Sequence, residues 1–324
     1  MKSHCAPVLL IVFNRPDLTL RVFEQIRAAR PPKLYVAADG PRSTEEELLC
    51  AEVRSIASQV DWPCRLFTLF RNHNMGCKLA VSQAISWFFE HEEMGIVLED
   101  DCLPLPHFFD FCSSMLPVYA QHPQIGHISG YTTVQPLDPT KYHPHSHQVT
   151  HYAHIWGWAG YRRVWQCYNV NPLQERGFSV KVIPGSWQHQ LFWLKSLLKV
   201  ENGYTKTWDF QYQYCLWKMK LWSVIPYQNY IENIGFDPRA THTSHTTMPI
   251  TRYMDPNDCK NSPGLLPFSR LLTVDNIVRN QFFKRNSLIL IVRLLFHSLL
   301  FYSKKVVALV KSWLYPTRAV MPNT

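Results

Sequence analysis

Short apolar runs alternate with segments of helical spacing over the first hundred residues, and this alternation limits the possible folds more than any other feature. The four strand-like runs are Val8–Phe13, Lys33–Ala38, Arg65–Phe70 and Gly95–Leu98. The segments with helical spacing are Leu18–Arg30, a stretch that opens at Ser43, and Lys78 to about Glu92. Such alternation predicts an α/β fold with a mostly parallel sheet and helices on both of its faces.

The composition is that of a folded protein that buries a sizeable core. The chain has 324 residues, of which 46% are hydrophobic and 18% charged, so it contains too little charge for a disordered chain. Its nine cysteines are odd in number, widely scattered and without a C-x-x-C pair. We therefore expect reduced thiols in a cytoplasmic protein. The first residues run directly into a strand, so we expect no signal peptide or N-terminal anchor.

The basic charge of the chain is concentrated in its last quarter. The formal net charge is +9, and residues 252–324 contain 11 Lys and Arg but only three Asp, which leaves the rest of the chain close to neutral. A nucleic-acid-binding domain carries its basic residues on the domain surface. We therefore predict that nucleic acid is not a partner.

The charge distribution also suggests three regions: a catalytic domain over 1–250, a linker rich in Pro, Asp and Asn over 251–281, and a basic amphipathic helical tail over 282–324. In the tail, Arg293, His297, Lys304 and Lys311 are 4, 7 and 7 residues apart, which places them on one side of a helix. Such a helix suits an anionic membrane surface, here the inner face of the cytoplasmic membrane. The alternatives are an oligomerisation helix and, less favourably because of Arg293, a membrane span.

Polar side chains follow three of the predicted strands directly. Arg15 follows the first strand, Asp39 the second, and Glu99, Asp100 and Asp101 the fourth. Ligands of parallel sheets bind beyond the carboxyl ends of the strands, so we expect these residues to converge at one edge. Three consecutive acids suit a hard cation such as Mn²⁺ or Mg²⁺; the alternative is a solvated acidic turn.

Three residues suit the binding of a nucleotide. Arg15 can meet a phosphate or a base carbonyl, and Asp39 can accept from the ring N–H of a uracil. Lys78 follows Asn74-Met75-Gly76-Cys77 at a predicted helix start, where lysine and backbone amides can bind phosphate. The alternatives are a surface arginine, a turn-forming Asp-Gly pair and a capped turn.

The run Leu98-Glu99-Asp100-Asp101, with Pro106-x-Phe108-Phe109 after it, resembles the metal motif of N-acetylglucosaminyltransferase I and its relatives, which are inverting glycosyltransferases of the GT-A fold. The resemblance extends thinly over about residues 7–245, through Trp156-Gly157-Trp158, Trp208-Asp209 and Gly235-Phe236 with His242. The opening of the chain is also similar to the broader family 2-like glycosyltransferases that use nucleotide-diphospho-sugars. The basic tail has no counterpart in this resemblance.

The resemblance implies a role for each matching residue. Asp101 would bind the metal, Asp100 the ribose, and Glu99 a hydroxyl of the donor sugar. Arg15 and Asp39 would bind the uridine. Asp209 would be the catalytic base, with Asp237 as the alternative candidate. The apolar neighbours of Asp209 favour a raised pKa, although an Asp at this position also suits the N-cap position at a helix start. Apart from the resemblance, we expect His242 or His245, in a closing C-terminal loop, to reach the metal or the diphosphate.

The sequence therefore predicts a bacterial, metal-dependent inverting glycosyltransferase. It would move a sugar from a UDP-sugar, UDP-N-acetylglucosamine being the donor that the family suggests, to a glycan or lipid-linked acceptor in surface polysaccharide synthesis. The alternatives are a sugar-nucleotide nucleotidyltransferase and a non-catalytic carbohydrate-binding protein. The aromatic residues Trp156, Trp158 and Tyr161 suit either sugar stacking or core packing, and the Pro/His-rich stretch 136–154 is expected to be a loop.

Overall fold

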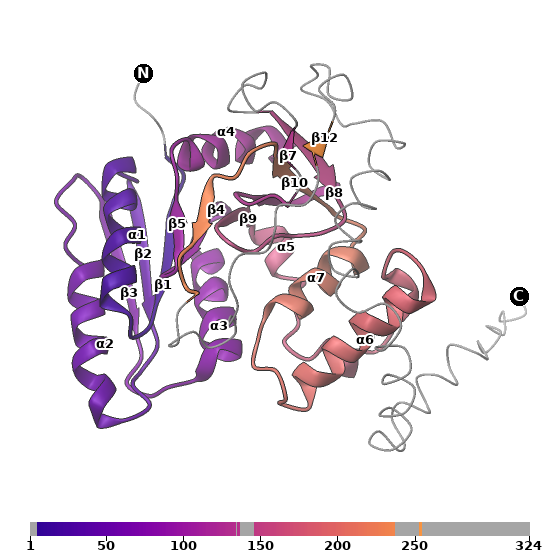
Figure 1. The fold of residues 1–324 in the computed structure, drawn as a ribbon, viewed down its shortest axis with the longest axis horizontal. Coiled ribbons are helices and arrows are strands. Elements are labelled where there is room, and N and C mark those ends of the chain that lie inside the picture. Colours follow the sequence, from indigo (N-terminus) through magenta and orange to yellow (C-terminus); the bar gives the residue numbers. More distant parts are fainter. Residues whose placement is uncertain (1–4, 134, 137–145, 237–252, 255–324) are drawn as a thin grey trace, which may run out of the picture.

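A computed structural model describes residues 5–133, 135–136, 146–236 and 253–254 (Figure 1). These residues form an eight-stranded sheet with the order β3-β2-β1-β4-β9-β6-β10-β8. The strands are β1 (Val8–Val12), β2 (Lys33–Ala38), β3 (Arg65–Phe70), β4 (Met94–Glu99), β6 (Ile125–Ser129), β8 (His147–Thr150), β9 (Trp158–Tyr161) and β10 (Trp222–Pro226). Only β8 and β9 run antiparallel to their neighbours in this sheet. The predicted α/β fold with a mostly parallel sheet is confirmed.

The central strands are buried because they are apolar throughout. All five residues of β1 are buried, and β1 lies between β2 and β4 in parallel register. A parallel strand that is covered on both faces needs such a continuous apolar sequence. The edge strand β3 contains only exposed and partly buried residues, since an edge has fewer neighbours.

Helices cover both faces of the sheet, as predicted. They are α1 (Pro16–Ala29), α2 (Thr44–Ala57), α3 (Gly76–His91), α4 (Phe108–Ala120), α5 (Arg162–Trp165), α6 (Trp187–Glu201) and α7 (Asp209–Lys218). The ring of Trp158 in β9 contacts Phe89 of α3 and Tyr212 of α7. On the opposite face, the hydroxyl of Tyr161 donates to the carbonyl of Leu116 in α4.

The elements of the described chain that the sequence pattern missed include α4, β8 and β9. Helix α4 contains Pro117, and β9 contains Gly160, both of which weaken a local prediction. The expectation of a loop over 136–154 was wrong for β8, which pairs antiparallel with β10. That pairing joins segments distant in the sequence, so a local pattern rich in His and Pro does not reveal it.

The aromatic residues considered for sugar stacking are mainly core residues. Trp158 is 1% exposed and Tyr161 4% exposed, so neither presents a face to a ligand. Trp156 is partly buried and lies edge-on to Tyr131 and Phe236. Of the three, only Trp156 remains a candidate for contact with a sugar.

Two short ladders complete the described fold. One pairs β5 (Cys102–Pro104) with β11 (Ile231–Asn233), and the other pairs β7 (Gln135–Pro136) with β12 (Tyr253–Met254). The first ladder places the backbone N–H of Ile234 on the carbonyl of Asp101 at 2.8 Å. It therefore brings a segment from the end of the described chain against the acidic run.

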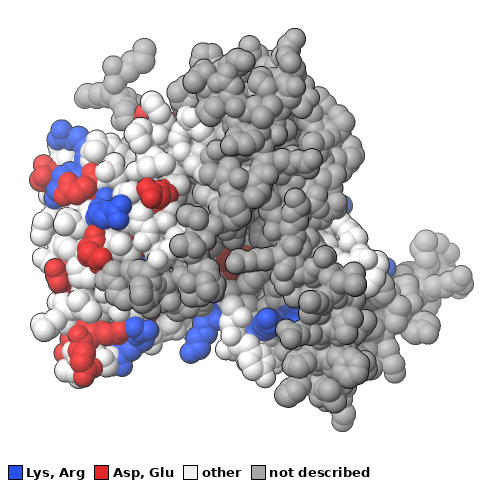
Figure 2. Space-filling model, in the orientation of Figure 1, with Lys and Arg blue, Asp and Glu red and all other residues white. Residues whose placement is uncertain are grey.

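The predicted linker and tail lie almost entirely outside the described residues, so the three-region division and the amphipathic helix remain predictions. None of the helices in the described part combines the length and the apolar character needed to cross a bilayer. On the face drawn in Figure 2, acidic and basic side chains of the described residues lie side by side over the α1 and α2 end of the molecule. This mixture agrees with a nearly neutral body.

Candidate functional site

The acidic run lies at the carboxyl edge of the sheet, where the sequence predicted it. In the β1–β4 register, Ile11 is opposite Glu99, so the residues that follow β1 and β4 meet at the same edge. Arg15 Nη2 is 2.5 Å from Asp100 Oδ1 and 3.0 Å from Asp101 Oδ2. The predicted convergence of Arg15 with the acids is therefore confirmed. We call Arg15, Glu99, Asp100 and Asp101 the acidic cluster.

Negative charge exceeds positive charge in the acidic cluster. Burial raises the pKa of Glu99 to about 8, assisted by the charges of Asp101, Asp100 and Asp209 and opposed by Arg15. Burial likewise raises the pKa of Asp100 to about 6, although the Arg15 guanidinium opposes this shift. One arginine thus faces three adjacent carboxyl groups, an arrangement that a further cation would stabilise.

The acidic cluster fits a hard divalent cation in its chemistry but supplies only part of a ligand set. Asp100 Oδ2 is buried and has no hydrogen-bond partner within the described chain, and carboxylate oxygens are the donors that Mn²⁺ and Mg²⁺ prefer. No group of three His, Cys, Asp or Glu side chains among the described residues is arranged to hold a metal. A cation here would therefore need ligands from a substrate or from residues such as His242, which lies outside the described part.

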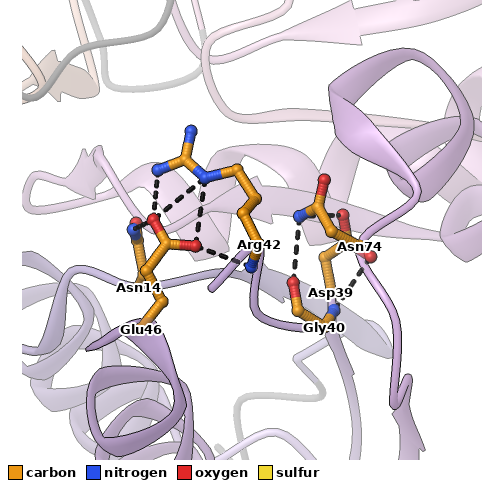
Figure 3. A network of polar contacts seen from close by, with 6 residues as sticks. All are labelled: Asn14, Asp39, Gly40, Arg42, Glu46 and Asn74. Carbon is orange, nitrogen blue, oxygen red and sulfur yellow. Dashed lines mark hydrogen bonds and ion pairs between the residues drawn. The ribbon is translucent and has the colours of Figure 1, made fainter. Parts of the chain in front are cut away.

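Asp39 holds two loops together (Figure 3). Its buried carboxylate accepts from the backbone N–H of Gly40 at 2.9 Å, Met75 at 3.0 Å and Gly76 at 3.1 Å. It also accepts from Asn74 Nδ2 at 3.0 Å. These donors come from the loop after β2 and from the start of α3. In this conformation the carboxylate has four partners already, so the predicted contact with uridine would have to replace one of them.

Gly40 packs directly against the same loop. A Cβ at this position would lie 2.4 Å from the backbone carbonyl carbon of His73, a distance that no side chain tolerates. The Asp-Gly pair therefore joins the two loops by close backbone approach as well as by hydrogen bonds. The turn-forming role of Asp39 follows from this geometry, and its role in binding a nucleotide stays a prediction.

A second network ties the loop after β1 to α2 (Figure 3). Glu46 accepts from Arg42 Nε at 2.9 Å and from Asn14 Nδ2 at 2.9 Å. The hydrogen bond from Arg42 is the main cause of the lowered pKa of Glu46. Asn14 immediately precedes Arg15, so this network restrains the segment that carries the cation of the acidic cluster.

Lys78 lies in the first turn of α3, where its Nζ donates to Asn171 Oδ1 at 2.9 Å. Burial lowers its pKa. The neighbouring Cys77 faces the site: burial raises the pKa of its thiol, and the charges of Glu99, Asp209 and Asp101 add to this effect. The start of α3 therefore adjoins the acidic cluster, while no contact of the described residues joins Lys78 itself to that cluster.

Asp209 is the first residue of α7, directly after the N-cap residue Trp208. The predicted helix start is therefore confirmed, whereas the predicted N-cap position of Asp209 was wrong by one residue. Its Oδ1 accepts from Thr207 Oγ1 at 2.5 Å and from the backbone N–H of Phe210 at 2.9 Å. Its charge contributes to the raised pKa of Glu99, although burial is the larger cause. Asp209 is therefore part of the electrostatic environment of the acidic cluster, which leaves its predicted role as a base compatible with the geometry.

Two features of the site escaped the sequence analysis. Gly235 packs against Asp101 so closely that a Cβ would lie 2.3 Å from Asp101 Oδ2. The second feature is the hydrogen bond from Thr207 to Asp209. The spacing Thr-x-Asp before a predicted helix is the sequence signal from which this contact could have been predicted. The roles predicted for the site residues in binding and catalysis remain predictions.

The chain was compared with protein families, curated proteins and solved structures. No family model and no curated protein matches it. A UDP-glucose pyrophosphorylase complexed with UDP-glucose is 12% identical, with 50% of this chain and 78% of that chain covered and a TM-score of 0.27. The 4-diphosphocytidyl-2C-methyl-D-erythritol synthase of Anaerococcus prevotii is 7% identical, covers 59% and 84%, and has a TM-score of 0.30.

An apo UDP-glucose pyrophosphorylase is 9% identical, with 66% of this chain and 97% of that chain covered and a TM-score of 0.26. TM-scores this low describe a distant likeness, which carries no conclusion about the activity of this chain. The sheet order and the acidic cluster therefore remain the basis for any functional proposal.

Proposed function

We propose that this chain is a metal-dependent inverting glycosyltransferase that moves a sugar from a UDP-sugar to a hydroxyl group of a glycan or lipid-linked acceptor. One observation carries the proposal. Arg15 meets Asp100 and Asp101 at the carboxyl edge of a parallel sheet, and a separate carboxylate, Asp209, lies near enough to contribute to the raised pKa of Glu99. Inverting transfer needs these two kinds of acid, one set for the donor and one base for the acceptor.

The charge imbalance of the acidic cluster supports a divalent cation. Asp101 and, from outside the described residues, His242 would hold Mn²⁺ or Mg²⁺ together with phosphate oxygens of the donor. When bound, the cation would offset negative charge on the departing diphosphate. Gly235 leaves room for the Asp101 carboxylate at this point.

The other residues of the site would bind the donor. Asp100 would accept from ribose hydroxyls and Glu99 from a hydroxyl of the donor sugar. Arg15 is already held by two carboxylates, so its contact with the uridine would come in addition to neutralising the acidic cluster. Asp39, in the loop after β2, would bind the uridine. Lys78 would bind the diphosphate after its hydrogen bond to Asn171 breaks.

Asp209 would take the proton from the acceptor hydroxyl as its oxygen attacks the anomeric carbon. The proton moves to the carboxylate, the new C–O bond forms, and the bond from the anomeric carbon to the diphosphate breaks. Only one base is required, because the leaving group is stabilised on the opposite side.

Attachment to an anionic membrane surface would bring the enzyme to a lipid-linked acceptor. This part of the proposal rests on the basic, apolar sequence of 282–324. We therefore propose that the protein acts on the cytoplasmic face of a bacterial membrane, in surface polysaccharide synthesis.

To test this proposal, the full chain is incubated with a panel of UDP-, GDP-, TDP- and CMP-sugars in the presence of Mn²⁺ or EDTA. The binding of each nucleotide sugar and the release of its nucleotide are measured. We expect Mn²⁺-dependent binding of one nucleotide sugar and slow release of its nucleoside diphosphate. Asp101→Asn should lose both, whereas the matched control Asp110→Asn, at an exposed position of α4, should retain them.

Two outcomes would contradict the proposal. Formation of pyrophosphate from UTP and a sugar 1-phosphate would identify a nucleotidyltransferase. Binding of sugars without any binding of nucleotide, unaffected by Asp101→Asn, would identify a carbohydrate-binding protein.

A further inference from the structure

We propose that Thr207 and Gln211 are positioning residues that hold the Asp209 carboxylate in one orientation and in its charged form. The inference rests on the proposed function, in which Asp209 is the base. It concerns how the chain prepares that base before an acceptor arrives.

The hydroxyl of Thr207 donates to Asp209 Oδ1 at 2.5 Å, and the backbone N–H of Phe210 donates to the same oxygen at 2.9 Å. Two donors on one oxygen fix the plane of the carboxylate. Hydrogen bonds from neutral donors also favour the charged form of the acid. Thr207 is therefore placed to orient Asp209 and to oppose its protonation.

The backbone that carries Thr207 is held by a buried glutamine. Gln211 is 1% exposed, and its Nε2 donates to the carbonyl of Thr207 at 3.0 Å and to that of Val170 at 3.4 Å. The hydroxyl of Tyr168 donates to the next carbonyl, that of Trp208, at 3.3 Å. The segment before α7 is thus held at two consecutive carbonyls.

Helix capping alone does not explain these contacts. The N-cap residue of α7 is Trp208, which makes no side-chain hydrogen bond to the helix. The Thr207 hydroxyl bonds to a carboxylate instead of to a backbone N–H of the first turn. A threonine that only started the helix would satisfy one of those N–H groups.

Several titratable groups surround Asp209 and influence its protonation. The titratable groups near Asp209 are Glu99 from β4, Cys77 from α3 and Tyr168 from the segment after α5. The Glu99 carboxyl group lies close enough to Asp209 for a Coulomb interaction, which favours protonation of Asp209 whenever Glu99 is charged. The donors from Thr207 and Phe210 oppose this effect, which keeps Asp209 ready to accept a proton.

The test measures Asp209 directly in the full chain. Aspartate is labelled with ¹³C at the carboxyl carbon, the Asp209 signal is assigned by its loss in Asp209→Asn, and its pKa is titrated by NMR. Thr207→Val keeps the shape of the side chain but removes the donor. We expect the pKa to rise by about one unit, Thr207→Ser to restore it, and the control Thr205→Val to leave it unchanged.

Gln211→Met provides a second variant. It removes the donor to the carbonyls of Thr207 and Val170, which costs stability. It also removes Gln211 Oε1, which is buried without a hydrogen-bond partner within the described chain, and this offsets part of that cost. We expect the Asp209 pKa to rise in the same direction by a smaller amount. In transfer assays, the acidic limb of the profile of kcat against pH should move to higher pH in both variants. The KM for the donor should be unchanged.

The outcomes separate this inference from the proposed function. If Asp209 titrates identically in the wild type, Thr207→Val and Gln211→Met, the positioning role is wrong whatever the activity. If the pKa shifts as expected but Asp209→Asn retains full transfer, the positioning contacts are real and the assignment of Asp209 as the base is wrong.

Discussion

Replacing Glu99 by glutamine should stabilise the protein at high pH and have little effect at low pH. The folded-state pKa of Glu99 is raised from 4.5 to about 8, chiefly by burial and then by the charges of Asp101, Asp100 and Asp209. Between these two values the native state binds a proton that the unfolded state has released. Stability therefore falls as pH rises through that window, and the neutral glutamine removes this dependence.

The size of the effect follows from the shift. At about 1.4 kcal/mol for each pKa unit, a shift of this size corresponds to about 4 to 5 kcal/mol. Glu99 is partly exposed and its neighbours can relax, so we expect about 2 kcal/mol in the measured free energy of unfolding.

The assay is urea unfolding of the full chain in EDTA, followed by tryptophan fluorescence, at pH 5 and pH 9. Glu99→Gln should exceed the wild type by about 2 kcal/mol at pH 9 and by much less at pH 5. The control is Glu90→Gln at an exposed position of α3, which should show no such difference between the two pH values. An equal effect of Glu99→Gln at both pH values would refute the electrostatic account of the acidic cluster.

Three further predictions concern the site and the core. Gly235→Ala places a methyl group 2.3 Å from Asp101 Oδ2. Mn²⁺-dependent nucleotide binding, measured by calorimetry, should therefore weaken at least about tenfold. Unchanged binding would contradict the packing argument. Arg15→Met removes the cation from Asp100 and Asp101, so urea unfolding at pH 8 should show a loss of about 2–4 kcal/mol that shrinks at pH 5, where carboxyl protonation replaces the lost pairing. Trp158→Ala should lower the free energy of unfolding, measured by the same method, by about 3–5 kcal/mol because the ring is 1% exposed. A loss below about 1 kcal/mol would contradict the assignment of Trp158 to the core and make it a candidate for sugar stacking again.

The first half of the fold was predictable because its elements follow local rules. The bounds of β2 and β3 agree with the predicted runs, and β1 ends one residue earlier, at Val12. A strand buried on both faces is apolar throughout, and the polar residues after it mark its end. Each of these signals lies within about ten residues, so no tertiary information is needed.

The second half was less predictable because its elements depend on distant partners. The strand β9 is inserted antiparallel between β4 and β6, and β8 forms the edge through β10. Neither strand is a strong strand former by itself. Tertiary pairing supplies hydrogen bonds and burial that outweigh the local preference.

For the site, the sequence by itself determined which residue types follow the strands and that parallel strands would carry Arg15 and the three acids to one edge. Only the tertiary structure decided how those groups are paired. It placed Arg15 on Asp100 and Asp101 and set Thr207 on Asp209. It also occupied Asp39 with four donors, three of which come from the separate segment 74–76. The physical reason is that the local pattern sets where strands end and which residue types follow them, whereas strand order, hydrogen bonds and pKa shifts depend on contacts between segments far apart in the chain.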